Sequence, residues 1–165
     1  GLYDALRTRL ARGGVQKARI TFPSLVFGCL RLAVRVADKK SECIRVCEFA
    51  SETIGALTEA DPLLALLLYL EGVATTAQCE NPAMVYDFLS TAIVLDGIQL
   101  EQQAKSAFNG LTLVLGALAD CAGSLDANNY ATLTNRLCKY ANHLPNDAER
   151  YVIPDYCFLL PNALA

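Results

Sequence analysis

The chain has 165 residues, 53% of them apolar, and a formal net charge of −3. A chain of this length can bury enough surface to fold as one domain without disulfide or metal staples. Its longest uncharged apolar run, residues 62–70, is nine residues long and ends at Glu71. That run is too short for a membrane-spanning helix, so we expect a core helix there.

Charge is distributed unevenly along the chain. Residues 1–40 hold nine basic and two acidic residues, a net charge of +7, whereas the remainder carries −10. A basic end can contact nucleic acid or an acidic membrane surface. The aromatic residues are not interleaved with the basic ones, however, and no nucleic-acid-binding motif is present. We therefore expect contact with a protein neighbour and no binding to nucleic acid.

The first three helix-length apolar segments are separated by clear breaks. The first is expected at residues 2–12, and the second at 21–38 with Pro23 near its start, where the missing N–H costs no hydrogen bond. The third is expected at residues 42–57, with Ser41 as its cap.

Five further segments follow at a similar spacing. Asp61 and Asn81 each precede a proline, a typical pairing of helix cap and first helical residue. No segment alternates with a period of two, so the fold class is all-α. These segments are expected at residues 62–78, 82–96, 99–122, from Ser124 or Asp126 to residue 143, and from residue 145 onward, where Pro154 should bend or break the helix.

The regular spacing of these segments indicates an architecture. The segments begin about every 20 residues, and a pair that repeats about every 40 is typical of stacked helix hairpins. Short connections make successive helices antiparallel neighbours. We expect residues 1–165 to form a HEAT-like α-solenoid of about four hairpins, a fragment of a longer helical-repeat subunit. A compact helical bundle also fits the periodicity.

A core can be proposed from the apolar stripes of these segments. The residues expected to be buried are Phe22, Leu25, Phe27, Leu30, Leu66, Leu67, Leu70, Phe88, Phe108, Leu111, Leu115 and Leu137.

No residue cluster indicates an enzyme, a metal site or a cofactor. His143 is the only histidine and lies at an expected helix end. A histidine there commonly interacts with the helix end and has no catalytic role. Cys43 and Cys47 share one helical face, but zinc needs about four ligands. The seven cysteines are odd in number and no signal peptide is recognisable, so we expect free buried thiols in a cytoplasmic protein.

Two polar stripes are candidates for partner binding. Ser24, Gly28, Arg31 and Arg35 follow helical spacing on an otherwise apolar segment. Arginine is favoured where a partner's carboxylates are met, so Arg31 and Arg35 are candidate contacts, with an internal salt bridge or plain solvation as the alternative.

The second stripe is neutral and lies in the segment expected at residues 99–122. It begins at Gln99 and continues through three further candidates for partner contact, Gln102, Ser106 and Asn109. Such a face suits a groove lined by hydrogen-bonding groups, although most stripes of this kind are only hydrated surface.

Three blocks of sequence resemble the large retromer subunit family, vacuolar protein sorting-associated protein 35. The blocks are ITFPSLVFGCLRLAVRV, ETIGALTEADPLLALLLYLEGVA and MVYDFLSTAIVLDGIQLEQQAKSAFNGLTLVLGAL, and their order and gaps also agree. The similarity spans residues 3–140, and the segment after Asn142 matches poorly.

The resemblance implies a non-catalytic scaffold from the C-terminal helical solenoid of that family. It implies one direct partner, a small subunit with a metallophosphoesterase-like fold, vacuolar protein sorting-associated protein 29. Other retromer subunits would be contacted through parts of the subunit beyond this chain. It further implies a location on the cytosolic face of endosomes, with indirect membrane association through the complex.

Two other functions fit the residues. One is a different helical-repeat adaptor in vesicle or nuclear transport, and a groove holding an extended peptide would favour it. The other is a helical bundle that carries a lipid or another apolar ligand, which an enclosed cavity would favour.

Overall fold

The structure is a computed structural model that describes residue 5 and residues 15–102 and 104–141. In these residues it is built from α-helices and one short 3₁₀ turn, η1, at Ala122–Ser124. The α-helices are α2 (Val15–Arg35), α3 (Lys40–Gly55), α4 (Pro62–Gln78), α5 (Pro82–Gln102), α6 (Ala104–Asp120) and α7 (Ala127–Ala141).

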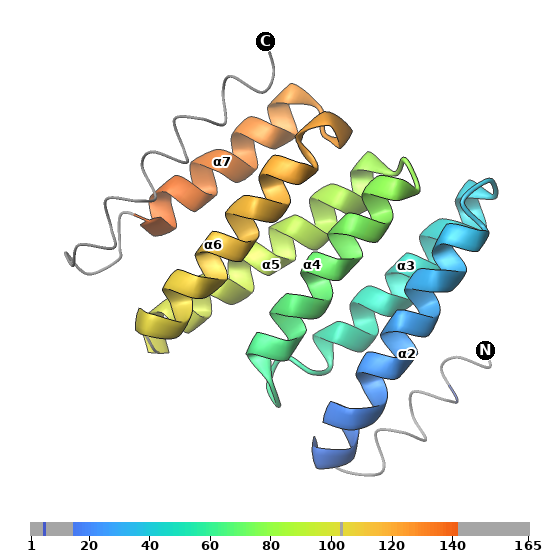
Figure 1. Ribbon diagram of the computed structural model, residues 1–165, viewed down its shortest axis with the longest axis horizontal. Coiled ribbons are helices and arrows are strands. Elements are labelled where there is room, and N and C mark those ends of the chain that lie inside the picture. The colour runs from blue at the N-terminus through green and yellow to red at the C-terminus, as the bar shows by residue number, and fades with distance from the viewer. Residues whose placement is uncertain (1–4, 6–14, 103, 142–165) are drawn as a thin grey trace.

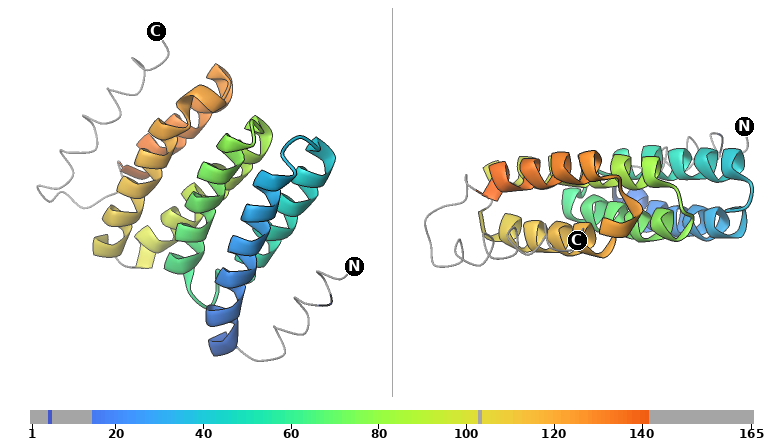
Figure 2. Two further views of the ribbon diagram at one scale, coloured as in Figure 1. Left: turned by 45° about the vertical axis from the view of Figure 1, so that its right-hand side comes forward. Right: turned by 90° about the horizontal axis from the view of Figure 1, so that it is seen from above.

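These helices form two layers (Figures 1 and 2). Helices α2, α4 and α6 lie side by side in what we call the front layer, because α4 contacts both α2 and α6. Helices α3, α5 and α7 form the back layer, where α5 contacts both neighbours. Each front helix also packs on the back helix that follows it in sequence. This row of stacked hairpins confirms the predicted α-solenoid.

The cap-plus-proline pairs begin α4 and α5 as predicted. The Asp61 carboxylate accepts a hydrogen bond from Leu64 N at 3.1 Å, and Pro62 opens α4. The Asn81 side-chain oxygen accepts from Met84 N at 3.3 Å. Asp61 also forms a salt bridge with Arg19, which joins the start of α4 to α2. One residue therefore both begins a helix and ties two hairpins together.

Two helix starts differ from the sequence prediction. Helix α2 begins at Val15, so Pro23 lies inside it instead of near its start. Ala18 and Phe22 are both buried on the face that continues into Val26, and this burial outweighs the hydrogen bond that proline cannot make. Ser41 does not cap α3, because the helix begins at Lys40 and the residue before it makes no side-chain cap.

The break between the fifth and sixth segments was also predicted wrongly. Helix α5 continues through Gly97 to Gln102, and α6 begins at Ala104. A single glycine costs a helix only about 1 kcal/mol, which packing can offset. Of the segment expected at residues 2–12 the structure describes only residue 5, which is helical. The segment expected from residue 145 onward, with Pro154, and His143 lie outside the described residues.

The core lies between the two layers. Phe22, Leu66, Phe88, Leu111 and Leu137 are all at most 2% exposed. Leu30 and Leu115 are also buried, as predicted, whereas Leu25 and Leu70 are partly buried against the core. The structure does not describe the side chain of Phe108, so its burial stays a prediction.

The burial prediction was wrong for two residues of the front layer. Phe27 is 43% exposed and Leu67 is 44% exposed. Apolar character alone therefore did not distinguish core from surface on these helices.

The described cysteines are free thiols, as expected. Cys29, Cys43, Cys47, Cys79 and Cys121 are buried, and Cys138 is half-buried. Among the described residues no helix is both long and apolar enough to cross a membrane.

Candidate partner-binding surface

The outer face of α2 carries the predicted arginine stripe. Ser24, Gly28, Arg31 and Arg35 are all exposed, as the helical spacing predicts. Neither Arg31 nor Arg35 forms an ion pair with a residue that the structure describes. Both guanidinium groups are therefore available to a carboxylate on a partner.

An apolar stripe lies beside these arginines on the same helix. Ile20, Phe27 and Val34 are spaced seven residues apart, and their side chains are 76%, 43% and 46% exposed. A spacing of seven keeps them on one face of the helix. The exposed face of α2 therefore combines apolar contact area with two cations, a composition common at the centre of protein interfaces.

The neutral stripe is divided between two helices. Gln99 and Gln102 belong to the last turns of α5, whereas Ser106 and Asn109 belong to the start of α6. The prediction of one continuous helical stripe is therefore wrong. The side chains of Gln102, Ser106 and Asn109 lie outside the described side chains, so their contact with a partner stays a prediction.

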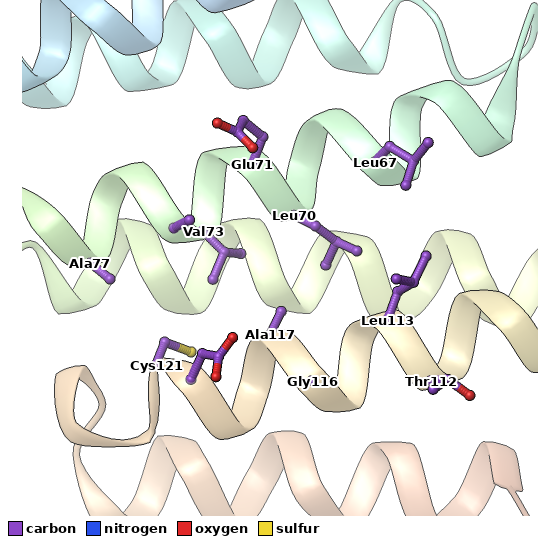
Figure 3. Close-up of a pocket in the computed structure, with 12 residues that line it drawn as sticks. Leu67, Leu70, Glu71, Val73, Ala77, Thr112, Leu113, Gly116, Ala117 and Cys121 are labelled. Carbon is purple, nitrogen blue, oxygen red and sulfur yellow. The ribbon is translucent and has the colours of Figure 1, made fainter.

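A groove of about 620 Å³ lies between α4 and α6 on the front layer (Figure 3). Helix α4 contributes Leu67, Leu70, Glu71, Val73, Ala74 and Ala77, and α6 with the residue after it contributes Thr112, Leu113, Gly116, Ala117, Asp120 and Cys121.

The groove is open to the surface and apolar at one end. Leu67 and Leu113 are 44% and 46% exposed and flank it from opposite helices. Figure 3 shows Leu70 and Leu113 projecting into the space between α4 and α6. Ala74, Ala77, Gly116 and Ala117 have small side chains, which leaves the space between the helices unfilled. Because the groove is open, it differs from the enclosed cavity expected of a lipid-carrying bundle.

This groove was not predicted from the sequence, although two signals pointed to it. Small residues occur on both α4 and α6, at positions that a close-packed helix pair would fill with larger side chains. An acidic residue, Asp120, ends α6, although helix C-termini favour basic residues. The relative position of α4 and α6, which brings these residues together, could not be read from the sequence.

Buried thiols gather where α3 meets the end of α4. The Cys43 thiol is a near neighbour of both Cys47 and Cys79. Burial raises the pKa of Cys47 and of Cys79, and the neighbouring Cys43 raises both further. Thiols with raised pKa values are weak nucleophiles and poor metal ligands. The described residues contain no group of His, Cys, Asp and Glu side chains that could hold a metal ion.

Comparison with known proteins identifies relatives of this chain in Arabidopsis thaliana. Vacuolar protein sorting-associated protein 35C is 28% identical over 149 residues, which cover 84% of this chain and 19% of that protein. The 35B protein is 25% identical over 148 residues, covering 84% of this chain and 18% of that protein. The 35A protein is 24% identical over 153 residues, covering 87% and 19%. The chain thus spans about a fifth of the length of these relatives.

The model of the family described as vacuolar protein sorting-associated protein 35 matches residues 1–153. This match covers all the described helices. The chain therefore belongs to the vacuolar protein sorting-associated protein 35 family.

Proposed function

We propose that this chain is a scaffold segment of the retromer complex and binds the small metallophosphoesterase-fold subunit, vacuolar protein sorting-associated protein 29, through its front layer. The observation that carries this proposal is the outer face of α2, where exposed Arg31 and Arg35 lie beside exposed Phe27 and Val34. Desolvated arginines next to apolar side chains are frequent binding hot spots.

Stacked hairpins support a role in binding a folded partner. A solenoid has an extended surface to which several repeats contribute, and its repeats hold that surface rigid. The front layer offers the outer faces of α2, α4 and α6 side by side. Family membership favours retromer over other helical-repeat adaptors, and it carries the proposed location on the cytosolic face of endosomes.

A calorimetric titration of the chain with the small retromer subunit tests this proposal. Double charge reversal, Arg31→Glu with Arg35→Glu, should weaken binding by at least tenfold and leave the helical circular dichroism unchanged. The charge-matched control reverses Arg45 on α3 and Arg136 on α7, both exposed in the back layer. Equal affinity of the two double variants would contradict the assignment to α2.

A further inference from the structure

We propose that the groove between α4 and α6 binds a short peptide segment of another protein. This segment carries one bulky apolar side chain and, about 10 Å from it, one arginine or lysine. The site is separate from the arginine stripe on α2, and it can be tested without the small retromer subunit.

The apolar part of the site lies where α4 and α6 carry their leucines. Leu67, Leu70 and Leu113 surround this end of the groove, and two of them are exposed (Figure 3). The total volume of about 620 Å³ falls within the range of sites that bury small ligands. An apolar side chain placed here would remove Leu67 and Leu113 from water.

The charged part of the site is acidic. Two charged residues line the groove, and both carry a negative charge. Asp120 lies on α6, whereas Glu71 lies at the rim, where Figure 3 shows its side chain projecting from α4 away from α6. Both are exposed, and neither forms an ion pair with a described residue. The groove therefore complements a cation and opposes an acidic occupant.

The ends of the helices strengthen the preference for a cation. Residues near the C-termini of both helices, Ala77 of α4 and Asp120 of α6, lie at the same end of the groove. The C-terminus of a helix carries a partial negative charge, so Asp120 is placed where its own helix disfavours it. A basic group from a ligand would relieve this repulsion. Asp120 at the C-terminus of α6 therefore lowers the stability of the free chain and raises its affinity for a basic ligand.

The spacing of the two parts sets the pattern of the ligand. Asp120 follows Leu113 by seven residues, which is two helical turns and about 10.5 Å along the axis. An extended peptide rises about 3.3 Å per residue, and its successive side chains point to opposite faces, so two side chains enter the groove together only when they are an even number of positions apart. We expect the basic residue four positions from the apolar one, about 13 Å along the peptide, and the flexible arginine or lysine side chain adjusts the remaining distance.

Fluorescence anisotropy with labelled peptides tests the site. Each peptide has a Gly/Ser background with one phenylalanine and one arginine, separated by one to five positions. The peptide with a separation of four should bind the 165-residue chain most tightly, because its two side chains share one face, and separations of three and five should bind more weakly. The version of the best peptide with glutamate in place of arginine should bind several-fold more weakly. Equal binding of all these peptides, or binding no tighter than the Gly/Ser background, would overturn the proposal.

A matched pair of glycine substitutions locates the binding site. A Cβ atom at Gly116 or at Gly28 would meet no atom within 4 Å, and both positions are exposed, so both Gly116→Leu and Gly28→Leu should fold. Gly116→Leu fills the groove and should abolish peptide binding, whereas Gly28→Leu on α2 should leave it unchanged. The opposite pattern would overturn the assignment to α4 and α6.

Asp120→Asn separates a binding role from a structural one. The substitution should weaken binding of the arginine peptide about two- to fivefold, because the ion pair between Asp120 and the arginine of the peptide is exposed to solvent. It should also raise the melting temperature of the free chain, because it removes a negative charge from a helix C-terminus. Unchanged affinity would contradict the role of this carboxylate. Concentration-dependent self-association in sedimentation, abolished by Gly116→Leu, would instead make a second copy of the chain the occupant and overturn the peptide proposal.

Discussion

Adjacent leucines in α4 have opposite structural roles. Leu66 is 1% exposed in the core, whereas Leu67 is 44% exposed and flanks the groove. The run that contains them is apolar on every side, so helical periodicity could not tell which leucine faces inward. Only the position of α4 between α2, α5 and α6 decides this.

Substitution by alanine should separate the two residues. Leu66→Ala removes a buried side chain and should lower the free energy of unfolding by about 2–5 kcal/mol. Leu67→Ala leaves no closed cavity and should cost about 1 kcal/mol or less. Urea unfolding of the two variants measures the difference. Equal costs would mean that Leu67 is buried in the folded chain.

Buried thiols predict a loss of stability at alkaline pH. Burial raises the pKa of Cys121 to about 11 from an ordinary value of 9.0. Below pH 9 the thiol is neutral in both states, so its contribution to stability is fully present. Above pH 9 the unfolded chain releases a proton that the folded chain retains, so stability falls until about pH 11.

This loss can be measured by urea unfolding at pH 8 and pH 10.5. Between these pH values the unmodified chain should lose more stability than the Cys121→Ala variant. The extra loss should be up to about 1.4 kcal/mol for each pH unit above pH 9. The comparison of the two chains removes the effect of the tyrosines and lysines, which titrate in both. Identical losses would contradict a raised thiol pKa.

At the scale of the elements, glycine marks the closest approach between α4 and α5. A Cβ atom at Gly72 would overlap the ring of Phe88, which is fully buried and packs edge-on against Tyr69 at a centroid distance of 5.7 Å. The ring is held on both sides and cannot move aside easily. Gly72 is thus a packing requirement and not a helix break.

Alanine at two glycine positions should therefore have opposite effects. Gly72→Ala should lower the free energy of unfolding by about 1–3 kcal/mol because of overpacking. Gly116→Ala meets open space and should raise it by up to about 1 kcal/mol through helix propensity. Thermal unfolding of both variants tests this pair. A stabilised Gly72→Ala variant would mean that α4 and α5 are further apart than described.

Helix starts could be predicted from the sequence where local chemistry determines them. Asp61 with Pro62 and Asn81 with Pro82 begin α4 and α5 as expected, since a cap and a proline act within one turn. The start of α2 and the end of α5 could not be predicted, because packing between helices carries α2 through Pro23 and α5 through Gly97. Long-range burial overrode the local signals at these two places.

For the whole molecule, the sequence predicted the repeat architecture and the exposed face of α2, but not the groove between α4 and α6. A period of about 40 residues indicates stacked hairpins, and the exposed face of α2 follows from helical spacing alone. The groove between α4 and α6 joins residues more than 30 positions apart, from Leu67 to Cys121. The groove depends on the relative position of neighbouring hairpins, which local sequence patterns do not determine.

Most directly, hydrogen–deuterium exchange of the chain with and without the small retromer subunit tests whether the front layer is the partner surface. We expect slower exchange in peptides from the front layer, above all α2, with little change in α3, α5 and α7. Binding that slows exchange only in the back layer, or no change anywhere in a folded chain, would contradict it.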